Sequence, residues 1–339
     1  METDSKNISI YNIECSPSYL INNLSMSKDS LYFIHNSQTF PRILIVNKKI
    51  LKEKSKNKSL SVLNSSEKNE MLFIKSIILK DTEYIAVGLY NGFKLWNKEG
   101  NRLLYQISNP NSNKNKIYAF VSCSAFLINS ECKNKDIADC ILSGDNYGQL
   151  HLIYGAKSSW KSSKLFATPN AESILSIGAS LETNKIGITL DNADILILKI
   201  EKNNCNLEKK IEGDGKQNIS INSVVFSNDG KNEFFLACGF INGMIKIISL
   251  NDYNLKFCIN SNLRSVGAMI VKGNNEIVTG SDDGRITIWK YDDIKDKIVL
   301  KKNILFEDKM IVGLAYDNND NNLYATSYDF PEIIVVSDI

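Results

Sequence analysis

The sequence predicts an all-β fold built from repeated four-stranded antiparallel sheets, and three observations support this prediction. Short strand-like runs bounded by Asn, Asp and Gly recur along the whole chain, whereas almost no segment shows a sustained helical period. One hairpin pattern returns five times. The chain is also 43% hydrophobic, which supplies enough apolar material for a large core.

Composition narrows the class of protein further. The 339 residues carry 40 Lys and Arg and 38 Asp and Glu, so the charges nearly balance. This balance argues against a dedicated nucleic-acid or membrane-surface protein, which usually has a clear basic excess. No stretch approaches the roughly 18 apolar residues of a membrane span, and the first residues lack the pattern of a secretion signal. The seven cysteines include no CxxC pair, which indicates reduced thiols. We therefore expect a cytoplasmic protein, with the nucleus as the alternative, and no metal or other cofactor.

The first part of the chain is weakly marked. Residues 8–13 form a strand-like run without a local partner, and residues 31–34 and 43–46 form a hairpin whose turn has no glycine. Residues 48–58, with six lysines, and the Asn/Lys-rich residues 109–116 are predicted to be mobile polar loops. RNA contact is the alternative for the lysine-rich run, although it lacks the aromatic and arginine residues that stack on bases or clamp phosphates.

Five clear hairpins follow. They span residues 84–96, 140–154, 186–199, 234–249 and 277–290. Three of them turn at Asn91-Gly92, Asn242-Gly243 and Asp283-Gly284, dipeptides that readily adopt the positive φ angles of a two-residue β-turn. Their spacing fits a repeat of roughly 40–45 residues, each repeat being one four-stranded sheet.

The last predicted sheet lacks one strand, and the first strand-like run of the chain can supply it. Three strands are expected at residues 311–316, 323–327 and 333–336, so the last sheet lacks an outermost strand. The unpartnered residues 8–13 can fill that place, cover an open sheet edge and tie the ends of a ring together. The elements therefore predict a single domain over residues 1–339, a seven-bladed β-propeller closed by its N-terminal strand.

One repeat resembles a known family. Residues 279–289, TGSDDGRITIW, are similar to the second half of a WD repeat, in which a small residue, a turn Asp and a strand Trp share a hydrogen-bonded set. The resemblance assigns these places to Thr279, Asp283 and Trp289. The fourth member of the set, a histidine in the loop before the first strand, has no counterpart. The resemblance implies a propeller of degenerate WD repeats over most of the chain, and such proteins commonly serve as scaffolds.

The search for catalytic groups is mostly negative. His35 and His151 are too far apart in the repeat pattern to cooperate easily, and the sequence has no phosphate-cradle, zinc-protease or nucleophile-elbow signature. Asp282 and Asp283 are adjacent carboxylates, but such pairs in turns usually accept hydrogen bonds from local backbone donors. We therefore predict that the protein is not an enzyme and takes no small-molecule substrate.

Candidate partner-binding residues come from the predicted turn tips. Turns between second and third strands share one face of a propeller, and here they carry Tyr90, Tyr147, Phe240 and Phe330. Tyr and Phe are enriched in interface cores, so we predict an aromatic partner-binding ring, with core packing as the alternative for some members. Trp160, in a polar context, is either an interface anchor or a side chain folded back onto the third blade.

These features predict a non-catalytic scaffold that binds one or more proteins through one face, within a larger intracellular assembly. The alternative is an accessory subunit of an RNA-processing or tRNA-modification complex, with residues 48–58 contacting the RNA backbone. No membrane contact is expected in either case.

Overall fold

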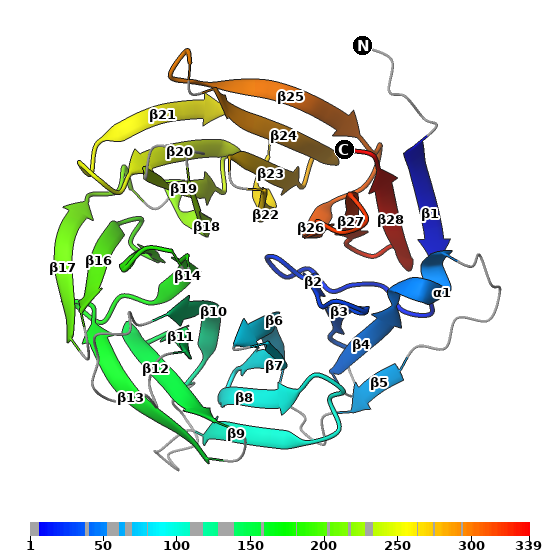
Figure 1. Cartoon of the computed structure of the whole chain (residues 1–339), viewed down its shortest axis with the longest axis horizontal. Coiled ribbons are helices and arrows are strands. Elements are labelled where there is room, and N and C mark those ends of the chain that lie inside the picture. The colour runs from blue at the N-terminus through cyan, green and yellow to red at the C-terminus, as the bar shows by residue number, and fades with distance from the viewer. Residues whose placement is uncertain are drawn as a thin grey trace.

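The structure, a computed structural model, consists of seven four-stranded antiparallel sheets arranged in a ring around a central axis (Figure 1). The predictions of an all-β fold and of seven blades are confirmed. The structure describes residues 7–37, 41–52, 61–64, 70–79, 81–108, 118–127, 139–156, 159–180, 182–201, 204–215, 218–227, 233–262, 264–273, 275–292 and 294–339.

Each of the first three blades adds its strands in chain order from the axis outward. Blade 1 consists of β2 (Ser25–Met26), β3 (Ser30–His35), β4 (Arg42–Asn47) and β5 (Ser61–Asn64). Blade 2 consists of β6 (Met71–Leu79), β7 (Thr82–Leu89), β8 (Gly92–Asn97) and β9 (Leu103–Ser108). Blade 3 consists of β10 (Phe120–Leu127), β11 (Asp139–Asp145), β12 (Gln149–Ala156) and β13 (Ser159–Ala167).

The next three blades repeat this order. Blade 4 consists of β14 (Ile174–Gly178), β15 (Lys185–Leu190), β16 (Ile195–Glu201) and β17 (Asn204–Ile211). Blade 5 consists of β18 (Ser220–Ser227), β19 (Phe234–Phe240), β20 (Met244–Ser249) and β21 (Leu255–Asn260). Blade 6 consists of β22 (Val266–Lys272), β23 (Glu276–Ser281), β24 (Arg285–Asp292) and β25 (Lys297–Leu305).

Blade 7 closes the ring by joining the two ends of the chain. Its inner strands are β26 (Ile311–Asp317), β27 (Asn322–Ser327) and β28 (Glu332–Ser337), and its outermost strand is β1 (Ile8–Asn12). The β1–β28 register runs from Ile8 opposite Val336 to Asn12 opposite Glu332. Because side chains alternate along a strand, Ile8 packs toward blade 6 and Tyr11 toward blade 1. The predicted closure is confirmed.

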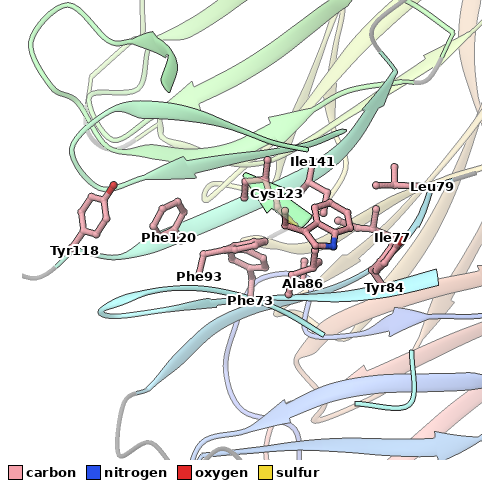
Figure 2. Close-up of a cluster of buried hydrophobic side chains, with 13 residues drawn as sticks. Phe73, Ile77, Leu79, Tyr84, Ala86, Phe93, Tyr118, Phe120, Cys123 and Ile141 are labelled. Carbon is pink, nitrogen blue, oxygen red and sulfur yellow. The ribbon is translucent and has the colours of Figure 1, made fainter. Parts of the chain in front are cut away.

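Neighbouring blades pack through apolar side chains that project from both faces of each sheet. Figure 2 shows the cluster between blades 2 and 3. The ring of Phe93, from β8, lies 5.8 Å from that of Phe120, on β10, and 6.5 Å from that of Phe73, on β6, measured between centroids. Burying one such phenylalanine contributes about 1.5–3 kcal/mol to stability. A comparable cluster lies at each of the other six seams, so apolar packing holds every blade on both faces.

The tight turns between second and third strands explain the glycine pattern of the hairpins. Gly284 has φ +82°, and a Cβ atom there would lie 2.1 Å from the carbonyl oxygen of Phe306. The corresponding turn of blade 4, residues 191–194, has no glycine, and Ala193 adopts φ 75° there instead. Its turn is held by polar side chains: Asn192 Oδ1 accepts the backbone N–H of Asp194 at 2.9 Å, and Asp194 Oδ1 accepts that of Gly213 at 3.0 Å.

The predicted lysine-rich loop is wrong for its first five residues. These form α1 (Lys48–Lys52), which places Leu51 in the core beside blade 7. Lys48 is also buried, and its Nζ pairs with Asp317 Oδ2 at 2.5 Å, which compensates for the loss of water around the charge. Residues 53–58, and the whole predicted loop at 109–116, lie outside the described residues. Among the helices that the structure describes, none is long and apolar enough to cross a membrane.

Candidate protein-interaction face

The strand order gives the ring two distinct faces. Strands alternate in direction, so the turn between second and third strands lies at the same end as the connection from the outermost strand to the next blade. We call this end the turn face, defined by the described residues 13–24, 36–37, 41, 70, 90–91, 118–119, 146–148, 168–173, 191–194, 212–215, 218–219, 241–243, 261–262, 264–265, 282–284, 306–310 and 328–331. The other connections form the opposite face.

Exposed apolar side chains gather on the turn face. Five large hydrophobic residues in its connections are 37–51% exposed, namely Tyr19, Ile21, Tyr90, Ile241 and Tyr328. Among the described connections of the opposite face, Ile294 is the only such residue. Single exposed apolar residues are ordinary, but their unequal distribution distinguishes the turn face from the opposite face.

Three of the residues predicted to bind a partner lie in turns of this face. Tyr90 is 39% exposed. Tyr147 is half-buried, with its ring centroid 6.0 Å from that of Tyr118. Phe330 is also half-buried and has Lys309 Nζ 4.3 Å from its ring centroid. Of these three residues, only Tyr90 is exposed.

Phe240 does not belong to an exposed ring of aromatic residues. It is the last residue of β19 and is 2% exposed within the apolar cluster that joins blades 4 and 5. Its place at the strand end turns the ring into the core, and the turn exposes the next residue, Ile241, instead. The core-packing alternative is right for this residue.

Trp160 is likewise not exposed, and it does not lie in a connection. It belongs to β13, the outermost strand of blade 3, and is 7% exposed. Its ring stands edge-on to Tyr84 of blade 2 at a centroid distance of 5.1 Å. The indole therefore fills the seam between blades 2 and 3, and its polar sequence neighbours belong to the exposed side of the strand.

The residues assigned by resemblance to a WD-type set lie together in blade 6. Trp289 Nε1 donates to Ser261 Oγ at 3.1 Å, and Ser261 Oγ lies 3.4 Å from Thr279 Oγ1. Asp283 Oδ1 accepts the backbone N–H of Arg285 at 3.1 Å and so holds the turn. Ser261 occupies the connection before β22, where the family has a histidine, so a serine supplies the hydroxyl that bridges the strands.

A segment that the sequence did not mark crosses the centre of the turn face. Residues 18–24 lead from β1 to β2, and Figure 1 shows this stretch reaching toward the axis. The backbone N–H of Asn22 donates to Gly267 O of blade 6 at 3.0 Å, and that of Asn23 donates to Val312 O of blade 7 at 2.7 Å. The side-chain amide of Asn22 also donates to Asn222 of blade 5. The segment thus joins blades across the axis.

Behind this segment lies a central cavity of about 520 Å³. The innermost strands line it mainly with apolar side chains, among them Leu72, Val121, Leu175, Ile221, Ile270 and Leu314. Lys75 is the only charged residue among the described lining residues. The cavity therefore does not bring together the paired carboxylates that acid–base hydrolysis of a glycoside requires.

His151 forms a buried polar cluster in blade 3. Its Nε2 lies 2.8 Å from Asp145 Oδ2 and 3.3 Å from the hydroxyl of Tyr118. Burial, with the nearby Asp145 carboxylate, raises the pKa of Tyr118. Asp145 is fully buried and its Oδ1 accepts the backbone N–H groups of Tyr147 and Gln149, both at 2.9 Å. This cluster stabilises the turn of blade 3 and is closed to a substrate.

Two tyrosines and an aspartate meet where the central segment crosses blades 6 and 7. The hydroxyl of Tyr19 donates to Asp282 Oδ2 at 2.7 Å, and the Tyr19 ring stands edge-on to Tyr328 with centroids 5.5 Å apart. Burial raises the pKa of Asp282, although the Tyr19 hydrogen bond and Arg264 act in the opposite direction. Burial and the Asp282 carboxylate raise the pKa of Tyr19 to about 12.

Comparison with known proteins gives the fold alone. No family model matches the chain, and no curated protein matches it. One chain in a crystal structure of the mitotic checkpoint complex is similar, with a TM-score of 0.70 over 97% of this chain and 91% of that chain, at 11% sequence identity. At so low an identity the similarity establishes a shared propeller architecture.

Proposed function

We propose that the protein is a non-catalytic scaffold of the WD-repeat type that binds a protein partner through the turn face, within a larger intracellular assembly. The observation that carries this proposal is the gathering of Tyr19, Ile21, Tyr90, Ile241 and Tyr328 on one face. Aromatic and large apolar side chains contribute most of the binding energy at protein interfaces. The similar chain mentioned above belongs to a multiprotein complex, which fits the same kind of role.

The RNA-contacting alternative has less support. Its main element was the lysine-rich run at residues 48–58, but Lys48 is buried in an ion pair with Asp317. Residues 53–58 lie outside the described residues. A location in the cytoplasm or nucleus stays a prediction.

The proposal is tested by affinity purification of the tagged protein from its native cells. The wild type is compared with a Tyr90→Ala/Ile241→Ser/Tyr328→Ala variant of the turn face and with an Ile294→Ser control on the opposite face. All four positions are exposed, so both variants are expected to unfold at the same temperature as the wild type. We expect the wild type and the control to retain a stoichiometric protein partner and the turn-face variant to lose it. Retention of every partner by the folded turn-face variant would contradict the proposal.

A further inference from the structure

The turn face is strongly acidic, although the whole chain has a formal net charge of only +2. The described residues of its connections include two basic residues, Arg264 and Lys309. They include twelve acidic residues: Glu14, Glu70, Glu172, Asp191, Asp194, Glu212, Asp214, Asp282, Asp283, Glu307, Asp308 and Asp329. Three of these carboxylates pair with cations of the neighbouring strands: Asp194 with Lys210, Asp214 with Lys246 and Asp283 with Arg285. The other nine still outnumber the two basic residues.

The opposite face shows no such excess. Its described connections contain eight acidic and seven basic residues. The charge is therefore separated between the two ends of the ring. A face with one sign of charge attracts and orients a partner of the opposite sign, so the turn face favours a cationic partner.

One group of these acidic residues lies around the contact between Tyr19 and Tyr328. Two backbone hydrogen bonds bring their segments together: Phe306 N–H donates to Gly284 O, and Tyr328 N–H donates to Met310 O, each at 2.9 Å. We call this region the blade 6–7 corner, defined by Tyr19, Asp282, Glu307, Asp308, Tyr328 and Asp329.

The acidic groups of the corner are mostly not neutralised by the protein itself. Glu307, Asp308 and Asp329 are exposed, and within the described parts of the chain their side chains form no hydrogen bond or ion pair. The neighbouring Lys309 is already engaged, because it pairs with Glu332 and its Nζ lies over the Phe330 ring. Arg264 is the remaining nearby cation.

Asp282 gives a second and independent indication of a ligand. It is 9% exposed, and its Oδ1 has no hydrogen-bond partner among the described residues, while Oδ2 accepts from Tyr19. A buried carboxylate oxygen without a donor is costly. Oδ1 lies beside Gly267, and the Tyr19 ring that bonds Oδ2 is half exposed. Exposed side chains change rotamer rapidly, so rotation of this ring can open space beside the carboxylate.

We propose that the blade 6–7 corner binds arginine and lysine side chains of a basic segment in a protein partner. A guanidinium group can donate to Asp282 Oδ1 and stack on the Tyr19 or Tyr328 ring, since it carries several N–H donors on a plane that packs on aromatic faces. Further basic residues of the same segment lie against Glu307, Asp308 and Asp329. This inference rests on the proposed scaffold function and specifies the chemistry of its partner.

Fluorescence anisotropy with a defined probe tests the inference on the full chain. The probe is a labelled peptide of about eight residues in which Arg and Lys alternate with Gly, and a matched peptide carries Glu in place of the basic residues. We expect the basic probe alone to bind, with an affinity that falls as salt rises from about 50 to about 500 mM, because such contacts are screened. Equal binding of both peptides, or binding of a single-stranded RNA but not of the basic probe, would overturn the inference.

Two variants with the same change in net charge separate the corner from general charge effects. Glu307→Gln/Asp308→Asn/Asp329→Asn removes three exposed charges from the corner, and Asp29→Asn/Asp81→Asn/Glu182→Gln removes three from the opposite face. We expect the first variant to bind the probe at least tenfold more weakly and the second to bind as the wild type does. Equal weakening of both variants would show that only net charge matters and would contradict the corner as a site.

Asp282→Asn addresses the buried carboxylate itself, and thermal unfolding verifies that the variant is folded. We expect it to weaken binding of the basic probe as well; unchanged affinity in the folded variant would remove Asp282 from the site. The native partner then separates the two proposals. One outcome is that the native partner is lost from the turn-face variant but kept by the Glu307→Gln/Asp308→Asn/Asp329→Asn variant. In that case the scaffold function stands and a basic partner is ruled out.

Discussion

At the scale of single residues, hydrogen bonds in blade 6 connect its second and third strands with the loop that precedes the blade. Ser261 stands where the WD family has a histidine, and its hydroxyl lies within hydrogen-bond distance of both Trp289 and Thr279. A shorter side chain thus preserves the connection between the strands and the preceding loop. No sequence pattern marks this role, because Ser261 lies among other polar loop residues.

Removing that bridge is expected to destabilise the protein. Ser261→Ala and Trp289→Phe each delete one partner of the same hydrogen bond, and each is expected to lower the free energy of unfolding by about 1 kcal/mol. The double variant should lose less than the sum of the two, since the shared bond can be lost only once. Denaturant unfolding of the four proteins measures this coupling, and strictly additive losses would contradict it.

The buried Lys48–Asp317 ion pair supports a second prediction. Asp317→Ala leaves the Lys48 ammonium buried without its partner, a change that costs about 3–5 kcal/mol in comparable pairs. Replacing both residues, as in Lys48→Met/Asp317→Leu, removes the unpaired charge and should recover most of that loss. Denaturant unfolding at neutral pH measures both effects. A double variant as unstable as Asp317→Ala would show that packing, and not charge, dominates.

The Lys48–Asp317 ion pair also makes the stability of the fold depend on pH in the acidic range. Burial raises the pKa of Asp317, but hydrogen bonds from Lys48 and the backbone outweigh burial, so its folded-state pKa lies below the ordinary value. A lowered carboxyl pKa stabilises the fold above the unfolded-state pKa of about 3.9, and this stabilisation is lost as pH falls through the folded-state value. Asp317→Asn should therefore lose less stability than the wild type below about pH 4. Parallel acid profiles of the two proteins would contradict this.

At the scale of elements, β1 carries the closure of the ring. Deletion of residues 1–12 removes this strand and leaves the edge of β28 unpaired, whereas deletion of residues 1–6 leaves β1 intact. We expect the longer deletion to lower the unfolding temperature and to promote association through the open edge, and the shorter one to do neither. Thermal unfolding and size-exclusion chromatography measure both properties. A longer deletion that stays monomeric and as stable as the wild type would show that β1 is dispensable.

The elements also show what a sequence can predict here. Hairpins with Asn-Gly or Asp-Gly turns, such as those at Gly243 and Gly284, follow from local chemistry, and the closing strand follows from counting unpaired edges. Short-range patterns did not reveal α1 or the crossing segment at residues 18–24, because their positions depend on distant blades. The burial of Phe240 and Trp160 depends in the same way on neighbouring blades. The difference in charge between the two faces becomes visible only when the strand order assigns each connection to the turn face or to the opposite face.

At the scale of the whole molecule, the blades differ in burial between rim and middle, and blade 6 shows this clearly. The residues of β23 are all buried and the strand is bonded on both sides, whereas β25 is largely exposed and bonded on one side only. We expect amide hydrogens of β25 to exchange faster than those of β23, because rim strands open without breaking the core. Hydrogen-exchange mass spectrometry measures this, and equal protection of the two strands would contradict it.

The pairing of β1 with β28 limits how far the ring can close while the chain is being synthesised. During translation β1 leaves the ribosome before β2 to β27, and its partner β28 leaves after them. β1 therefore stays unpaired while those strands are synthesised, and contacts so distant along the chain form slowly. A nascent chain that stalls before β28 remains an open arc.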